Sequence, residues 1–192
     1  MVDVQNDYCH PEGVLGHAGL DLTGVTPMRA VITRLRSAAH SAGVPVIFLE
    51  TIHSDRTDTP AWSRRSPYSE SICRDGSWGA EPFEIEPGDD EVITKHRYSG
   101  FVDTRLDVAL RSLERSTLVV TGTATNVCVE STVRDARMRD YDVIVVEDGV
   151  AAPSLAAHEA SLENMRRHFG PVVVSTQIEK LWAPTAPSSP TA

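Results

Sequence analysis

The sequence has no apolar run long enough to cross a membrane. Hydrophobic residues make up 41% of the 192-residue chain, yet none of their runs approaches the roughly 20 residues that a transmembrane helix needs. The first residues, MVDVQNDYC, are acidic and polar, whereas a secretory signal has a basic start followed by an apolar stretch. We therefore expect a cytoplasmic protein with no membrane partner.

A basic tract is also missing. The net charge is −9, and the densest basic positions are single pairs such as Arg64–Arg65 and Arg166–Arg167. Nucleic acids and anionic membrane surfaces are bound by clustered Lys and Arg. The composition thus argues against a nucleic-acid partner and leaves a small-molecule substrate open.

Cysteine and lysine are both scarce. The three cysteines, Cys9, Cys73 and Cys128, are odd in number and no pair has zinc-ligand spacing, so we expect neither a disulfide framework nor a cysteine zinc site. Only two lysines, Lys95 and Lys180, stand beside sixteen arginines. A lysine in such an Arg-rich chain points to a position that needs a compact ammonium group.

Apolar strands and amphipathic helices alternate along the chain. We expect strands at 1–4, 44–50, 91–94, 117–121, 142–147 and 171–175. We expect helices capped by Thr26, Asp103 and Ser154, and further helices near 126–139 and 177–182.

This alternation predicts an α/β fold, because parallel strands need crossover helices. We expect a three-layer α/β/α Rossmann-like domain with a mainly parallel sheet of about six strands. A single domain would span residues 1–182, and the low-complexity segment 183–192 would be a disordered tail. The long polar stretch 51–90 is expected to carry function.

Three chemically complementary residues follow strands of this predicted sheet. Asp3, Lys95 and Cys128 each lie near the carboxyl end of a strand, where open α/β sheets bind ligands. A carboxylate can take the proton of a thiol, an ammonium can stabilise the thiolate, and a helix N-terminus adds a favourable field. Taken singly, each of the three is more often a core thiol or a solvated charge, so the nucleophile hypothesis depends on their convergence.

Four blocks, in this order, resemble the isochorismatase-like cysteine hydrolases. They are VDVQNDYC at 2–9, DGSWGAE at 75–81, KHRYSGF at 95–101 and TGTATNVCVESTVRDA at 121–136. The similarity extends over nearly the whole chain to about Trp182. It implies that Asp3 is a general base, Lys95 a charge partner and Cys128 the nucleophile.

The resemblance implies further features of the site. These are a cis peptide at Thr123–Ala124 and an oxyanion hole formed by the N–H groups of Ala124 and Cys128. Within the family, KHRYSGF and TNVCVEST look most like the ureidoacrylate, biuret and N-carbamoylsarcosine amidohydrolases. That similarity implies a small amide or ureide substrate and a homo-oligomer. The substrate-contacting candidates are Asn126, Tyr98, Tyr8 and Trp78.

Two departures from the family pattern shape our expectations. Nicotinamidases of this fold carry an Asp-x-His metal motif, but the matching positions here read Thr51-Ile52-His53, so we expect no metal and no cofactor. Family members have several apolar residues before the Asp-x-Gln block, whereas this chain has two residues before Asp3. We therefore expect a shortened central strand, and either a start upstream of Met1 or a protein of marginal stability.

Several functions remain as alternatives to a cysteine amidohydrolase. Isochorismatase-type vinyl-ether hydrolysis is disfavoured by Cys128, since enzymes of that reaction lack the nucleophilic cysteine. A nicotinamidase-type activity is disfavoured by the missing metal motif. A catalytically silent binding protein of the same fold and a thiol redox sensor are the alternatives from other classes.

Overall fold

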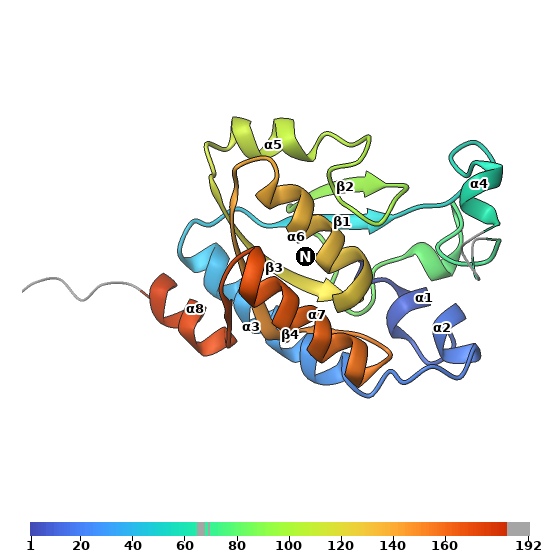
Figure 1. Ribbon diagram of the computed structural model, residues 1–192, viewed down its shortest axis with the longest axis horizontal. Helices are drawn as coiled ribbons and strands as arrows, with labels where there is room; N and C mark the ends of the chain where they lie inside the picture. Colours follow the sequence, from blue (N-terminus) through green and yellow to red (C-terminus); the bar gives the residue numbers. More distant parts are fainter. Residues whose placement is uncertain (65–67, 69, 184–192) are drawn as a thin grey trace, which may run out of the picture.

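Strands and helices alternate in the computed structural model, which describes residues 1–64, 68 and 70–183 (Figure 1). The described strands are β1 (Ile47–Thr51), β2 (Glu91–Lys95), β3 (Thr117–Thr123), β4 (Asp142–Ala151) and β5 (Val172–Val173). The longer helices are α3 (Val25–Ser41), α5 (Leu106–Ser112), α6 (Glu130–Arg137), α7 (Leu155–His168) and α8 (Ser175–Trp182). All but the first residue of the predicted tail 183–192 lies outside the described residues.

The strands pair in parallel in two groups that the N-terminal segment joins. β1 pairs with β2, and β3 pairs with β4, which pairs with β5. Val2 lies between the groups and forms one parallel bridge to Leu49 of β1 and another to Gly122 of β3. Its N–H donates to the Thr121 carbonyl, and its own carbonyl accepts from the Thr123 N–H, both at 2.9 Å. The α/β class with parallel pairing is therefore confirmed.

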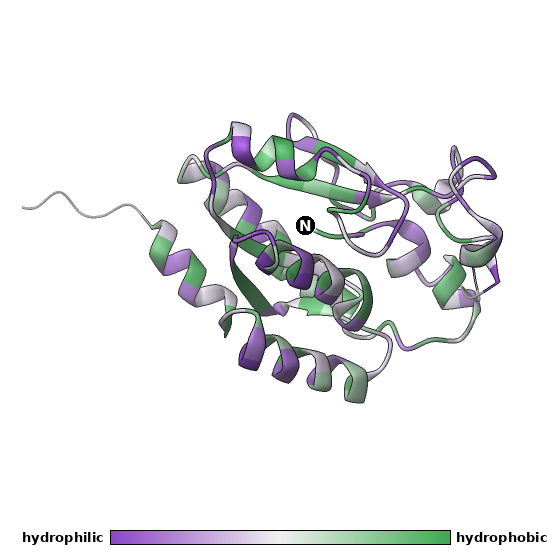
Figure 2. Ribbon diagram, turned by 45° about the horizontal axis from the view of Figure 1, so that its top comes forward, coloured by the Kyte–Doolittle hydropathy of each residue, from purple (hydrophilic) through white to green (hydrophobic). Residues whose placement is uncertain are grey.

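Helices cover both faces of the strands because the β-strand side chains alternate between them. Val120, Val143 and Val145 pack with residues of α5, α6 and α7 in one cluster. Their neighbours Val119, Ile144 and Val146 pack on the other face with residues of α3 and α8. Figure 2 shows the result, with hydrophobic strands inside and hydrophilic residues along the outer sides of the helices.

The expected count of about six strands is wrong for the described residues, which contain five. The segment 1–4 makes only the isolated bridges of Val2, because Asp3 adopts a φ of 49° and so ends the extended backbone there. The strand expected at 1–4 is thus reduced to these two bridges. The remaining strands lie close to their expected positions, although β4 extends to Ala151 and β5 is only two residues long.

One of the three predicted helix caps is correct. Ser154 caps α7, since its Oγ accepts from the Ala157 N–H at 3.3 Å. The helix assigned to Thr26 begins earlier, at Val25, whose side chain is buried in the core. Asp103 does not cap α5, because its φ of 55° places it in a turn and the Thr104 hydroxyl accepts from the Leu106 N–H instead.

Among its described residues, the polar stretch 51–90 holds two short helices that the sequence pattern did not predict, α4 (Pro60–Ser63) and the 3₁₀ turn η1 (Trp78–Ala80). The N-terminal region adds α1 (Asn6–Cys9) and α2 (Val14–His17). All three cysteines are free and buried. None of the helices in the described part of the chain has the length and hydrophobicity to span a membrane.

An apolar cavity of about 530 Å³ lies between β1 and β3, towards the amino ends of the strands. Met1 and Val2 line one end of it, and side chains of α3, α5 and α8 line its walls. The residues proposed for catalysis do not line this cavity. It is therefore a packing feature of the sheet and not our candidate for the substrate site.

Candidate active site

Asp3 and Lys95 form an ion pair with no solvent exposure. Lys95 Nζ lies 2.8 Å from Asp3 Oδ2, and both side chains are completely buried. Asp3 is placed by its backbone, whose N–H donates to the Leu49 carbonyl of β1 at 2.9 Å. Lys95 is the last residue of β2. Two chain segments that are far apart in sequence thus bring opposite charges together. Because neither charge is solvated, each is stabilised mainly by the other.

Two further oxygens complete the surroundings of the Lys95 ammonium. Nζ donates to Thr51 Oγ1 at 2.7 Å and to the Arg97 carbonyl at 3.1 Å. With Asp3 Oδ2 this makes three acceptors, which matches the three protons of an ammonium group. A neutral amine has only two protons to donate, so the arrangement favours the charged form of Lys95.

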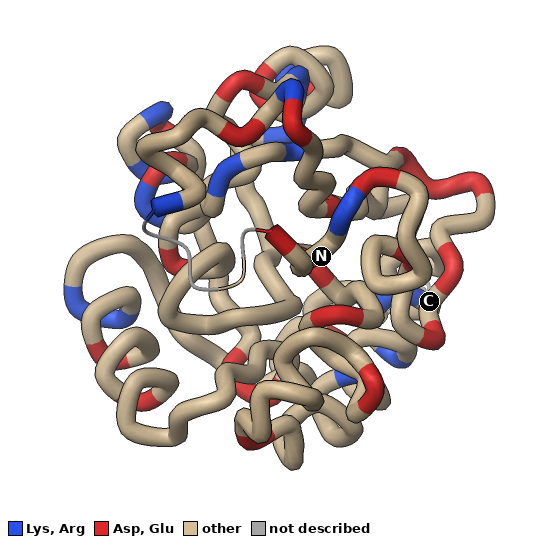
Figure 3. Tube along the Cα trace, turned by 90° about the vertical axis from the view of Figure 1, so that its right-hand side faces the viewer, with Lys and Arg blue, Asp and Glu red and all other residues tan. Residues whose placement is uncertain are grey.

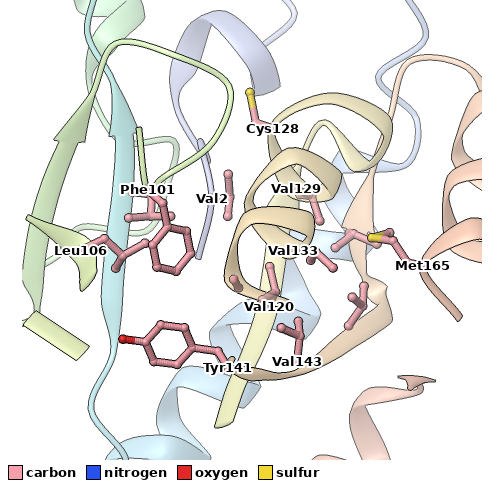
Figure 4. Close-up of a cluster of buried hydrophobic side chains, with 14 of the residues drawn as sticks. Val2, Phe101, Leu106, Val120, Cys128, Val129, Val133, Tyr141, Val143 and Met165 are labelled. Carbon is pink, nitrogen blue, oxygen red and sulfur yellow. The ribbon is translucent and has the colours of Figure 1, made fainter. Parts of the chain in front are cut away.

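Cys128 lies where β3 passes into a helix. The Thr123–Ala124 peptide at the end of β3 is cis, as expected. A π-helical turn, η2 (Thr125–Val129), follows and leads into α6. In Figure 4 the Cys128 thiol lies at the edge of the apolar cluster and is directed away from the Val129 and Val133 side chains. Its side chain is buried, with 4% of the residue exposed.

Cys128 belongs to the same electrostatic unit as the ion pair. Burial raises the pKa of the Cys128 thiol above its ordinary value, the negative charge of Asp3 raises it further, and Lys95 opposes both effects. For Lys95, burial alone lowers the pKa, but the charges of Asp3 and Cys128 outweigh it and leave the pKa raised. The raised pKa values of both groups favour their protonated forms, so a neutral thiol and an ammonium are the resting forms of Cys128 and Lys95.

Two of the four expected substrate contacts lie close to this unit. Burial raises the pKa of Tyr8, with further contributions from Cys73, Asp3 and Cys128. Burial and the charge of Cys128 likewise raise the pKa of Tyr98. Tyr98 is 42% exposed, so part of its side chain is open to solvent.

The other two expected contacts, Trp78 and Asn126, are exposed. Trp78 is 46% exposed and packs edge-on against His10, with ring centroids 5.0 Å apart. Asn126 is exposed in the η2 turn, two residues before Cys128.

Residues of the stretch 51–90 form one wall beside Tyr98. Trp62 packs on Tyr98 with ring centroids 4.8 Å apart and stacks on His53 at 5.8 Å. The Arg97 guanidinium lies over the Trp62 ring at 4.9 Å and donates to the Thr57 carbonyl. Sequence reasoning missed Trp62, because nothing in an aperiodic segment indicates which aromatic residue folds back onto the site.

The positions that match the nicotinamidase metal motif are engaged in other contacts. Thr51 binds Lys95, and His53 Nδ1 lies 2.8 Å from Asp58 Oδ1 with both side chains buried. Within the described ranges, no group of three or more His, Cys, Asp or Glu side chains is arranged to hold a metal ion. Charged residues elsewhere are dispersed, and Figure 3 shows the basic positions spread among the more numerous acidic ones.

Comparison with known proteins identifies the family. A model of the isochorismatase domain matches residues 1–177. A ureidoacrylate amidohydrolase of Methylobacterium radiotolerans is 40% identical over 190 residues, covering 88% of this chain and 73% of its own length.

Two solved structures extend the likeness to the fold. A cysteine hydrolase from Pseudomonas syringae pv. phaseolicola has a TM-score of 0.84 and 31% identity, with 95% of this chain and 90% of that chain covered. An N-carbamoylsarcosine amidase from Thermoplasma acidophilum has a TM-score of 0.74 and 30% identity, with 91% and 93% covered. The chain therefore belongs to the isochorismatase family.

Proposed function

We propose that this protein is a cysteine amidohydrolase that cleaves the C–N bond of a small ureide, N-carbamoyl or amide substrate through a covalent acyl-enzyme. The observation that supports the proposal is the fully buried ion pair between Asp3 and Lys95, whose charges also shift the pKa of the Cys128 thiol. Burying two charges costs free energy unless their mutual attraction compensates for the lost hydration. A thiol placed beside such a pair has both a proton acceptor and a source of positive charge.

In the proposed first step, Cys128 Sγ attacks the substrate carbonyl carbon while Asp3 takes the thiol proton. Lys95 stabilises the negative charge that develops on sulfur. The N–H groups of Ala124 and Cys128 would bind the carbonyl oxygen as it becomes an oxyanion. The C–N bond then breaks, the proton passes from Asp3 to the leaving nitrogen, and ammonia or an amine departs from the thioester.

In the second step, water attacks the thioester carbon as Asp3 takes one of its protons. The C–S bond breaks, the proton returns to sulfur, and a carboxylic or carbamic acid leaves. Atoms and charges balance over the cycle, which consumes one water and one amide bond. No redox partner or cofactor is needed by this chemistry.

The substrate class rests on the relatives. One is named a ureidoacrylate amidohydrolase and another an N-carbamoylsarcosine amidase, so both names describe substrates with a carbamoyl nitrogen. Tyr8 and Tyr98 are our first candidates for contacts with such a group, because their pKa values respond to Cys128. Asn126 and Trp78 remain candidates for substrate contacts only if the substrate extends to them. We also propose that the protein forms a homo-oligomer.

The test is ammonia release from a panel of ureides, carbamoyl amino acids, biuret and primary amides. We expect turnover of one subgroup and a loss on the order of 10⁴-fold or more in Cys128→Ala. Cys9→Ala is the matched control, since Cys9 is also a buried thiol but packs in a separate apolar cluster. Full activity in Cys128→Ala would reject the mechanism. Silence of the folded wild-type protein across the panel would favour the silent binding protein.

A further inference from the structure

The Thr51 hydroxyl lies between the two charges of the site. It donates to Asp3 Oδ1 at 3.0 Å and accepts from Lys95 Nζ at 2.7 Å. A hydroxyl has one proton, and here that proton points to the carboxylate. Its lone pairs are therefore left for the ammonium and for the Tyr8 hydroxyl, whose pKa also responds to a hydrogen bond with Thr51. The result is a directed chain of hydrogen bonds from Lys95 through Thr51 to Asp3, in which each bond polarises the next.

The backbone holds Thr51 in this place. Thr51 and Lys95 are direct register partners in the parallel pair of β1 and β2, so their side chains stand next to each other on one face. The Gln5 side-chain amide forms two hydrogen bonds with the Thr51 main chain. Its Oε1 accepts from the Thr51 N–H at 2.8 Å, and its Nε2 donates to the Thr51 carbonyl at 2.9 Å. These bonds leave the Thr51 hydroxyl little freedom to move.

The geometry limits what Lys95 can do when a thiolate forms on Cys128. All three of its protons already have oxygen acceptors. Lys95 also lies within hydrogen-bonding reach of the Cys128 thiol, so one of the protons can turn to the sulfur. The contact to the Arg97 carbonyl is the longest of the three and is only partly buried. Asp3 and Thr51 would then keep two protons in place while the third moves between the Arg97 carbonyl and Cys128.

We infer that Thr51 is a positioning residue of the proposed reaction: its hydroxyl keeps Lys95 charged and aimed, so that a thiolate can form on Cys128. This rests on the proposed function, because it assigns Thr51 a role through Asp3, Lys95 and Cys128. Other titratable groups act on the same unit and could contribute to its pH dependence. They are Tyr8, Cys73, Tyr98, Glu50, Cys9 and the Met1 amine.

The experiment measures the rate at which iodoacetamide alkylates Cys128 as a function of pH, with the modified peptide quantified by mass spectrometry. The variants are Thr51→Val, which keeps the side-chain shape without the hydroxyl, and Thr51→Ser, which keeps the hydroxyl. Thr51→Ala is a second hydroxyl-free variant that only deletes atoms. Thr117→Val, at the exposed far end of β3, controls for the general effect of the exchange. Thermal melts establish that each variant is folded.

We expect Cys128 alkylation between pH 7 and pH 9 to be about tenfold slower in Thr51→Val and Thr51→Ala than in the wild type, because the thiolate becomes harder to form. Thr51→Ser and Thr117→Val should stay within about threefold of the wild type. A folded hydroxyl-free variant that is alkylated at the wild-type rate would overturn the inference, whatever its melting temperature. Faster alkylation would also overturn it, because Thr51 would then compete with Cys128 for the Lys95 protons.

This readout separates the inference from the proposed function, since alkylation needs no substrate. If alkylation slows as expected while the amide panel stays silent, the role of Thr51 in tuning Cys128 stands and the proposed substrates are wrong. If substrates are turned over but Thr51→Val behaves as wild type, the proposed function stands and the inference is wrong.

Discussion

The hydroxyl of Thr132 donates to the carbonyl oxygen of Cys128 at 2.7 Å. Thr132 lies one turn further along α6, and its Oγ1 also accepts from the Gly100 N–H at 3.0 Å. Gly100 belongs to the loop that follows β2 and Lys95. One buried side chain therefore connects the segment that carries the nucleophile to the segment that carries the ammonium.

We predict that Thr132→Val weakens both stability and turnover. The exchange leaves the buried Gly100 N–H without its acceptor, which costs about 1–3 kcal/mol of the free energy of unfolding. Because the two segments are no longer tied, we expect kcat/KM to fall about tenfold while KM changes little. Urea denaturation and steady-state kinetics measure the two effects. Thr132→Ser should retain both, and wild-type kinetics in Thr132→Val would show that the connection is only structural.

Removing one partner of the buried ion pair should cost more than removing both. Lys95→Met leaves the Asp3 carboxylate buried without its cation, and we expect a loss of about 3–5 kcal/mol in the free energy of unfolding. The double variant Asp3→Asn with Lys95→Met removes both charges and should recover much of that loss. Asn is chosen at position 3 because it tolerates the φ of 49° better than most residues.

Neither the single nor the double variant should turn over substrate. Denaturation curves and the amide panel on the same samples check this prediction. A double variant that is no more stable than Lys95→Met alone would mean that the pair is held by packing and not by its charges. Activity in either variant would contradict the roles assigned to Asp3 and Lys95.

The alternation of strands and helices was predictable because strands buried on both faces read as apolar runs, and helices show a 3.6-residue stripe. The three residues proposed for catalysis could be selected for the same reason, since each follows a recognisable strand. The first strand was harder to judge. Its extent depends on the backbone of Asp3, whose positive φ ends the pairing after Val2, and apolar periodicity does not report φ.

The parts of the site that sequence reasoning missed depend on register and on loop packing. Thr51 could have been found by aligning the ends of β1 and β2, because it lies opposite Lys95. Thr132 could have been found from its spacing of four residues after Cys128. Trp62 had no such signal, since it reaches Tyr98 from a segment without periodicity. Trp78 is the opposite case. Its motif is recognisable in the sequence, but its ring packs on His10.

Buried thiols should make the protein less stable at alkaline pH. Burial, assisted by the charge of Asp3, raises the pKa of Cys9 from its ordinary 9.0 to about 12. Between pH 9 and pH 12 the unfolded chain has lost this proton while the folded chain retains it. The contribution of Cys9 to the free energy of unfolding should therefore be constant below pH 9 and then fall by up to about 1.4 kcal/mol per pH unit. The raised pKa values of Tyr8, Cys73 and Cys128 act in the same direction.

Urea denaturation at pH 8, 9, 10 and 11 measures this dependence. Cys9→Ala should be less stable than the wild type at pH 8 because a buried side chain is truncated, yet its stability should fall less steeply above pH 9. The comparison of slopes isolates the titration from the packing loss. Equal slopes in the two proteins would contradict the assignment to Cys9.

The apolar cavity between β1 and β3 should accept an added strand. In a parallel ladder, alternate residues direct both of their backbone polar groups to the same side. Ile47 already accepts from the Met1 amine at 2.9 Å, and Thr121 accepts from Val2. By this alternation, the Ile47 N–H and both polar groups of Val119 face the cavity. Side chains of α3, α5 and α8 line it on either side, so an extended apolar segment would find hydrogen bonds at its edges and hydrophobic contacts on its faces.

We therefore predict that four β-branched apolar residues added before Met1 stabilise the protein. Burying their side chains gains more than ordering the segment costs, and we expect about 1–3 kcal/mol net, or roughly 3–10 °C in Tm. A Gly-Ser extension of equal length is the control, because it can neither fill the cavity nor favour a strand. Differential scanning calorimetry compares the two. If the apolar and Gly-Ser extensions gave the same Tm, the cavity would close by relaxation of α3 and α5 and would not accept a strand.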